Sequence, residues 1–381
     1  MRHILESLTT GATLLLVFLI ISNPKRVNLN ANRWLAFFLF CVFIVMLDEL
    51  LLWGNIYYRY PHLYGIAALV VLLIPPALYL TILSYITPGR NFEKKDLIHF
   101  SLFFVFFLLI LPFIFSDADS KLKQLAIDKN EDNLSDTSSL VTIILFLLQL
   151  SVYWILSYIR FLRYQKNIRL YMSSENLVDL QWLKYFLWSL LFMILLWVPS
   201  VFFNLNFFLV IADLCFFIGI FLLSFFSVRQ DEIFKFSPDV TLEIKELLEP
   251  TNIKSSAKKP GQEKVIHLKE QLTHLMETQK PFLQSDLTLP SLAALLNTST
   301  NTLSYVINAG YDQNFFQFVN QYRIDEVKKQ LIDPKNDHLS IVGIGFNSGF
   351  NSKTVFNTSF KQSVGMTPSE YRKTRSAITS H

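Results

Sequence analysis

The stretch Asp286-Leu-Thr-Leu-Pro-Ser-Leu-Ala-Ala-Leu-Leu-Asn-Thr-Ser-Thr-Asn301 decides the fold of the C-terminal part of the chain. Thr288 can cap a helix, and Pro290 then falls in the first turn, where its missing N–H matters little. Asn297 follows at a turn that favours a left-handed residue, which Asn tolerates better than most side chains. A second helix begins near Ser299. The stretch therefore predicts helix, tight turn and helix, which is the geometry of a helix-turn-helix.

The same pattern recurs about fifty residues downstream. Ser340 can cap a short helix over residues 341–346, Gly349 supplies the turn, and residues 351–362 form the second recognition helix. The short helix contains Gly343 and Gly345, and each glycine costs about 0.8–1.0 kcal/mol relative to alanine. We therefore expect that alanine at position 345 would stabilise this unit.

Three further helices complete the C-terminal part. A stripe of Val265, Leu268, Leu272 and Leu275 is spaced 3-4-3. It is interpreted as core, with a dimerising coiled coil as the alternative. A longer helix, 315–332, places its apolar residues on a shared face, namely Phe315, Phe318, Val319, Tyr322, Val327 and Leu331. A Thr cap, a proline and a glutamate in Thr367-Pro-Ser-Glu370 form a capping box that opens a last short helix.

An ordered set of residues in this region resembles the AraC/XylS-type transcription regulators over about 110 residues. The matching residues are Leu287-Thr-Leu-Pro-Ser-Leu-Ala293, Leu303-Ser304, Asn314-Phe315, Arg323-Ile324, Ser340-Ile341, Gly349-Phe350, Phe360-Lys361 and Gly365-Met-Thr-Pro-Ser-Glu-Tyr-Arg372. The resemblance implies two subdomains, each placing one recognition helix in successive major grooves of double-stranded DNA. It departs from the family at Gly345 and Val327, where alanine is usual, and the first recognition helix lacks the common Arg or Lys.

Ten polar residues are the candidate DNA contacts, because spacing exposes them on the two recognition helices. They are Thr300, Asn301, Ser304, Tyr305 and Asn308 in the first helix, and Lys353, Thr354, Asn357, Thr358 and Lys361 in the second. Asn can pair bidentately with adenine, Ser and Thr can meet several base edges, and Lys can neutralise phosphate. The alternative is an ordinary solvated helix face. RNA polymerase is a further partner if the protein activates transcription.

The N-terminal part has a different composition. The whole chain is 52% hydrophobic and 17% charged, with 36 Phe, whereas soluble proteins average about 25% charged. Nearly all long apolar runs precede Val228, and a helix needs about 20 apolar residues to cross a bilayer. Seven segments qualify as membrane-spanning helices: 4–22, 34–53, 62–87, 97–115, 140–161, 182–203 and 207–228.

The charges of the loops predict the orientation of these helices. The first, third and fifth loops carry eleven basic residues, against five on the other side. The N-terminus is therefore expected outside and everything after Val228 in the cytoplasm, which makes the protein a multi-pass protein of the cytoplasmic (inner) membrane. Membrane confinement also favours pairing into a homodimer, although the sequence leaves the oligomeric state open.

Three intramembrane carboxylates, Asp48, Glu49 and Asp213, are the candidate sensor. They are expected at a similar depth, toward the outer leaflet, where ionisable groups usually face the bundle interior or a water-filled cavity. Pro75-Pro76 and Pro199 could bend the helices beside such a cavity. An unknown small ligand or ion, such as a cation, a proton or a small amine, could bind there. The alternative is that Asp48 and Glu49 reach the interface while Asp213 pairs locally.

The expected organisation is all-α. It comprises a seven-transmembrane-helix bundle over 1–228, a cytoplasmic linker over 229–262 that includes a short helix near 242–248, and an AraC-type domain with two helix-turn-helix units over 263–375. The sequence contains no phosphate-binding glycine loop, zincin motif or nucleophile elbow, so no enzyme, cofactor or metal is predicted. The predicted function is a membrane-bound one-component transcription regulator. The alternative is a transporter or channel-like protein with a regulatory cytoplasmic domain.

Overall fold

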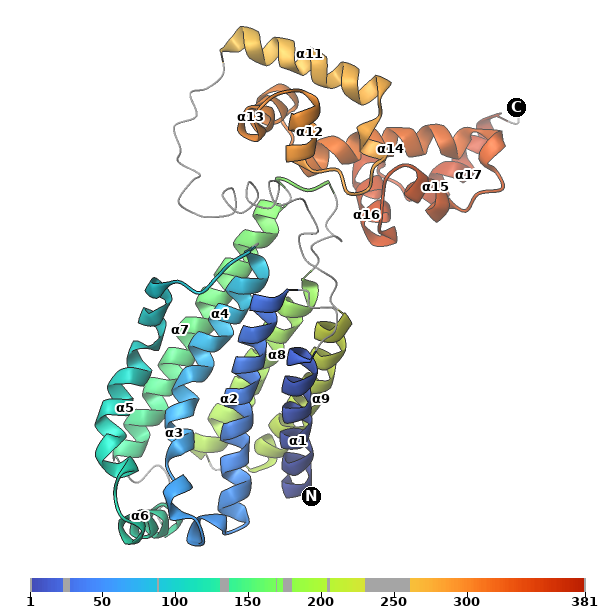
Figure 1. The fold of residues 1–381 in the computed structure, drawn as a ribbon. Helices are drawn as coiled ribbons and strands as arrows, with labels where there is room; N and C mark the ends of the chain where they lie inside the picture. Colours follow the sequence, from blue (N-terminus) through green and yellow to red (C-terminus); the bar gives the residue numbers. More distant parts are fainter. Residues whose placement is uncertain are drawn as a thin grey trace. The chain divides into compact units, whose positions relative to one another are not determined.

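The computed structural model describes residues 2–22, 28–87, 89–130, 137–168, 170–173, 180–203, 206–229 and 261–379. Within these ranges the regular structure is helical, apart from one isolated bridge between Met172 and Thr288, so the predicted all-α class is confirmed. The chain divides into two compact units (Figure 1). The first comprises Met1–Leu162 and Leu180–Ile233, and the second comprises Arg163–Asp179 and Phe234–His381.

The first unit is built mainly from long apolar helices, and each of the seven predicted segments falls on one helix or on consecutive helical pieces. The helices are α1 (Arg2–Ile21), α2 (Leu29–Trp53), α3 (Ile66–Val70), α4 (Ile74–Ile86), α5 (Ser101–Ile114), α6 (Ala118–Asn130), α7 (Thr137–Ile168), α8 (Gln181–Phe203) and α9 (Asn206–Arg229). α1 lies against α2 and α9, α2 lies against α4, and α8 lies against α9 (Figure 1). Such continuously apolar runs satisfy all backbone groups internally only as helices.

Six segments of the described chain are long and apolar enough to cross a membrane: His3–Ile21, Leu29–Trp53, Pro61–Ile86, Lys94–Ile114, Ile143–Ile168 and Gln181–Pro199. The seventh predicted span lies in α9, whose apolar stretch Val210–Leu223 is shorter. The number of spans therefore stays a prediction. Pro75 and Pro76 occupy the first turn of α4, directly after the 3-10 turn η3 (Val71–Leu73), so the third predicted span consists of three consecutive helical pieces.

The second unit contains seven helices within its described residues: α11 (Gln262–Thr278), α12 (Leu289–Leu295), α13 (Thr300–Tyr311), α14 (Phe315–Ile332), α15 (Ile341–Asn347), α16 (Lys353–Val364) and α17 (Pro368–Thr379). The predicted helices of this region are confirmed. Most of the predicted linker, including the short helix expected near 242–248, lies outside the described residues.

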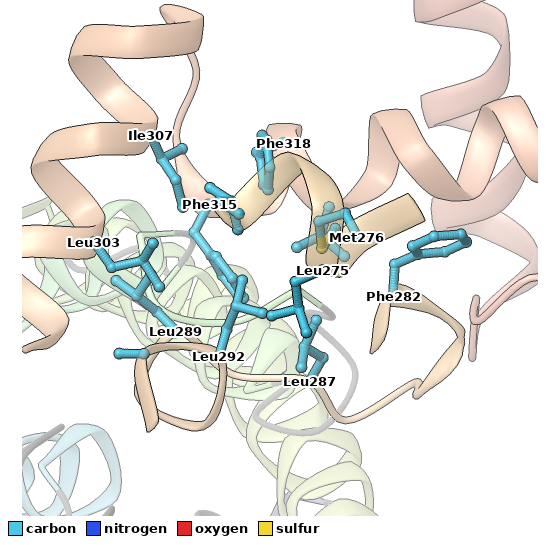
Figure 2. Close-up of a cluster of buried hydrophobic side chains, with 13 residues drawn as sticks. Leu275, Met276, Phe282, Leu287, Leu289, Leu292, Leu303, Ile307, Phe315 and Phe318 are labelled. Carbon is cyan, nitrogen blue, oxygen red and sulfur yellow. The ribbon is translucent and has the colours of Figure 1, made fainter. Parts of the chain in front are cut away.

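Two hydrophobic cores hold these helices, and α14 contributes to both. Figure 2 shows the first core, in which leucines of α11, α12 and α13 meet Phe315 and Phe318 of α14. The second core joins Ile324, Val327 and Leu331 of α14 to side chains of α15 and α16. Full burial of one such side chain stabilises the fold by about 1.5–3 kcal/mol. Because one helix serves both cores, the two helix-turn-helix units are held in a fixed relation.

Two residues of the stripe on α11, Leu272 and Leu275, belong to the first core, while Leu268 is buried and Val265 is half-buried. Leu272 and Met276 are fully buried, and Leu275 is also buried there. Lys269 of α11 reaches the end of α13, where its Nζ donates to the carbonyl oxygen of Gly310 at 2.7 Å. The core interpretation of the stripe is therefore confirmed.

Candidate DNA-binding surface

The first helix-turn-helix is set by local hydrogen bonds at the ends of its helices. The Thr288 hydroxyl accepts from the backbone N–H of Ser291 at 3.2 Å and caps α12. Asn297 has φ 49°, the left-handed conformation expected at the turn. The Ser299 hydroxyl accepts from the N–H of Thr302 at 3.2 Å and caps α13. Each cap satisfies a donor that the helix leaves free, and it contributes about 1 kcal/mol.

The second helix-turn-helix follows the same plan. Ser340 caps α15 by accepting from the N–H of Gly343 at 3.0 Å, and Ser352 caps α16. Gly349 lies between them with φ +95°. A Cβ at this position would stand 2.3 Å from the carbonyl oxygen of Phe282, so both the backbone conformation and the close approach require glycine.

Arg323 of α14 joins the loop between α11 and α12 to the turn of the second unit. The side chain is 1% exposed. Its Nε donates to the carbonyl of Phe282 at 2.8 Å and its Nη2 to the carbonyl of Gln284 at 2.8 Å. The guanidinium also lies 5.9 Å from the ring centroid of Phe350, which follows the turn of the second unit. Burial lowers the pKa of Arg323 to about 10, with Asp286 opposing that shift, so the group remains a cation at neutral pH.

A short segment after α7 also binds this arginine. The guanidinium donates to the carbonyl of Ser173 at 2.9 Å and to its hydroxyl at 3.0 Å. The segment pairs with the chain before α12: the N–H of Leu289 donates to the carbonyl of Tyr171 at 2.9 Å, and the Ser173 hydroxyl donates to the carbonyl of Leu287 at 2.6 Å. The sequence carries no signal for this contact, because Ser173 and Arg323 are 150 positions apart.

Four of the five predicted contact residues on α13 reach the surface. Asn301 and Asn308 are exposed, and Ser304 and Tyr305 are half-buried. Thr300 is only 4% exposed, so the expectation that it is exposed was wrong. It lies three and seven positions before the buried Leu303 and Ile307, and residues with that spacing share one face of a helix.

The five predicted residues on α16 are all accessible. Lys353, Thr354, Thr358 and Lys361 are exposed, and Asn357 is half-buried. The two surfaces differ in charge, because α13 carries no ionisable group except Tyr305 and Tyr311, whereas α16 presents two lysines. The amide and hydroxyl groups of α13 suit base edges, while the lysines of α16 suit phosphate.

The paired units agree with a known family. Residues 292–374, from α12 into α17, match the family model described as a helix-turn-helix domain. The C-terminal part of this chain is an AraC-type helix-turn-helix domain. An AraC-type domain binds DNA in transcription regulators and is not itself enzymatic. In this AraC-type domain α13 and α16 are the second helices of the two units.

Two solved structures are similar to the AraC-type domain over part of this chain. The C-terminal domain of AraT, a response regulator from Geobacillus stearothermophilus, is 32% identical; the match covers 29% of this chain and 84% of that chain, with a TM-score of 0.25. A protein of unknown function from Listeria innocua is 24% identical; the match covers 28% of this chain and 94% of that chain, with a TM-score of 0.24.

The three carboxylates predicted as a sensor occupy different surroundings in the first unit. The hydroxyl of Tyr57 donates to Asp48, and the neighbouring Tyr64 donates to Asp128. Glu49 is exposed. Asp213 instead lines a cavity that includes neither Asp48 nor Glu49. The structure therefore separates Asp213 from the other two candidates.

Proposed function

We propose that this protein is a membrane-bound one-component transcription regulator. Its AraC-type domain would bind a specific DNA sequence under the control of a signal that is sensed at or in the membrane. The observation that carries the proposal is that one chain holds an AraC-type domain and, within its described residues, six helical segments long and apolar enough to cross a bilayer. No separate signalling protein is then needed between the membrane and DNA.

The proposed DNA contacts are the accessible polar residues of α13 and α16. Asn301 is the assigned base reader, since it is exposed in the first turn of α13 and an Asn side chain can pair bidentately with adenine. Lys361 is an assigned phosphate contact, since it is exposed on α16. The shared helix α14 supports the proposal that both helices read one continuous site. Thr300 is not one of the proposed contacts, because it is buried.

The proposed location is the cytoplasmic membrane, with the N-terminus outside and the AraC-type domain in the cytoplasm. The bias of eleven basic residues against five in the loops supports this orientation. The proposal includes contact with membrane lipid, with double-stranded DNA and, if genes are activated, with RNA polymerase. Confinement of the copies to a membrane favours a homodimer.

Two covalent connections could pass a signal to the AraC-type domain. One follows α9, and its residues 230–260 lie outside the described chain. The other is the stretch Arg163–Asp179, which begins in the last turns of α7 and ends before α8, and which belongs to the same compact unit as the AraC-type domain. The hydrogen bonds of Ser173 to Arg323 support a role for this second connection.

The test is the DNA occupancy of the full-length protein across the genome of its host, followed by measurement of binding to the recovered site. Asn301→Ala should relax base preference by roughly 1–3 kcal/mol at one position. Lys361→Ala should weaken binding to all sequences and lower the slope of log affinity against log salt by about 1. These different losses follow from the different roles of base and phosphate contacts.

Lys264→Ala is the matched control, because this exposed lysine lies on α11, outside both helix-turn-helix units. It should change neither base preference nor the salt slope. Thermal unfolding of each variant separates lost contacts from lost structure. If the full-length protein occupied no discrete genomic sites, the proposed regulator function would be wrong. If occupancy survived but both variants bound like the wild type, the function would stand and the residue assignment would be wrong.

A further inference from the structure

A cavity of about 310 Å³ lies among the helices of the first unit. Five helices line it: α2, α4, α7, α8 and α9. Its wall is apolar and partly aromatic, with Phe146, Trp154, Trp197 and Phe216 among its residues, and with the flexible side chains of Met46 and Met193. Pockets for small molecules are usually lined in this way, with few polar groups.

The volume limits the size of the occupant. An apolar cavity of roughly 150 Å³ holds one benzene molecule. A cavity of about 310 Å³ therefore has room for a body of two fused rings, or a branched apolar body of similar volume. Methionine side chains adapt their shape to such an occupant at little energetic cost, because they rotate about three bonds.

One carboxylate distinguishes this cavity from a simple apolar void. Asp213 is the only charged side chain among the described residues that line it. A carboxylate within a membrane helix is expensive and usually faces a partner of opposite charge or a polar cavity. Aromatic rings attract cations through their negative faces, and the attraction grows where water is excluded. The carboxylate and the aromatic wall therefore favour the same kind of occupant.

We propose that this cavity is a ligand site for a small hydrophobic cation, with the ammonium group at Asp213 and the apolar body against Trp154 and Trp197. The proposal deepens the proposed function, because such a ligand would be the signal, but binding itself needs no DNA. The indole N–H of Trp154 donates to the carbonyl of Leu187 at 2.8 Å. This hydrogen bond fixes the orientation of the ring against which the apolar body would pack.

The experiment measures binding of 2-(2-naphthyl)ethylamine to the purified full-length protein in lipid nanodiscs by equilibrium dialysis, with empty nanodiscs as the blank. Its neutral analogue, 2-(2-naphthyl)ethanol, has the same apolar body and lacks the positive charge. Because opposite charges attract more strongly in a low-dielectric site than in water, the wild type should bind the amine at least about tenfold more tightly than the alcohol.

Three variants test the assignment. Asp213→Asn should remove the preference, so that the amine and the alcohol bind alike, while retained binding of the alcohol shows that the cavity persists. Ala212→Met should fill the cavity and weaken both ligands, because Ala212 is buried in its wall. Asp119→Asn makes the same chemical change as Asp213→Asn on the exposed start of α6 and should leave both affinities unchanged.

Two results would overturn the proposal. One is equal binding of amine and alcohol by the wild type, and this result does not depend on any variant being folded. The other is an amine preference that survives in Asp213→Asn. Either result would leave DNA binding untouched, so failure of this ligand site is distinguishable from failure of the proposed regulator function.

Discussion

Gly345 lies in α15 against the ring of Phe356, a residue of α16. A Cβ added at position 345 would meet three atoms of this ring at 2.9–3.1 Å. Phe356 is itself fully buried between Phe350 and Phe360, so its ring has little room to move. The expectation that alanine would be favourable here considered helix propensity alone, and the close packing overturns it.

Gly345→Ala should therefore destabilise the second helix-turn-helix. Overpacking of a core typically costs about 1–3 kcal/mol, which exceeds the gain of at most about 1 kcal/mol in helix propensity. Thermal unfolding of the full-length protein, followed through the α15–α16 region by hydrogen exchange, measures the change.

The double variant Gly345→Ala with Phe356→Leu is the control for this explanation. Leucine is smaller than phenylalanine and should relieve the clash with the Cβ at position 345. The double variant should therefore lose less free energy of unfolding than the sum of the losses of the two single variants. Full additivity of the two losses, or a more stable Gly345→Ala protein, would contradict the packing argument.

Among the elements, the segment 170–173 is short but firmly held by the second unit. Met172 and Ser173 are each 1% exposed, although they lie between α7 and α8 of the chain. The Ser173 hydroxyl serves two partners at once, since it donates to the carbonyl of Leu287 and accepts from the guanidinium of Arg323. A buried arginine depends on such acceptors to satisfy its donors.

Ser173→Ala should loosen this docking. The substitution removes one acceptor from the buried guanidinium of Arg323. The free energy of unfolding is expected to fall by roughly 1–3 kcal/mol. Hydrogen exchange of the full-length protein should show faster exchange at the start of α12 and in residues 170–173. Ser369→Ala, an exposed serine in the first turn of α17, is the matched control. Unchanged exchange around α12 would mean that the hydroxyl contributes little.

The capping box of α17 makes that helix sensitive to acid. The Glu370 carboxylate accepts from the N–H of Thr367 at 2.7 Å, and this backbone hydrogen bond, with that to the Thr367 side chain, lowers the pKa of Glu370. A lowered pKa in the folded state means that the stabilisation is present above the unfolded pKa and is lost as pH falls through the folded pKa. The capping box that the sequence predicts therefore stabilises α17 less as the pH falls.

We expect protection of the α17 amides, corrected for intrinsic exchange rates, to fall from neutral to acidic pH in the wild type. In Glu370→Gln the amide can still accept the capping bond but does not titrate, so the dependence on pH should be weaker. Equal pH profiles for the two proteins would show that another group governs the acid response of α17.

At the scale of the whole molecule, the orientation of the chain in the membrane decides whether the AraC-type domain can reach DNA. A reporter that is active only outside the cytoplasm should be silent when fused after His381 and active when fused near Asp128. The physical reason is the excess of basic residues in the first, third and fifth loops. Equal expression of both fusions is the control, and the reverse activity pattern would rule out a DNA-binding role in the cell.

The sequence alone was enough to predict most of the helices and the class of the C-terminal domain. Apolar runs of bilayer length can only be helices, and the caps at Thr288, Ser299, Ser340 and Thr367 act on backbone groups within three residues. These are local interactions, so a linear pattern suffices to predict them. The same holds for most of the proposed DNA contacts, because helical spacing largely determines which face is exposed.

The distant groups that meet in the fold could be identified only from the structure. It placed Phe356 where a Cβ of Gly345 would have to be, Ser173 on Arg323, and Asp213 in an aromatic-lined cavity apart from Asp48. Each of these pairings depends on how helices pack and on which side chains fill the space between them. Close packing in a protein interior makes such contacts sensitive to a single atom, and no periodicity along the chain encodes them.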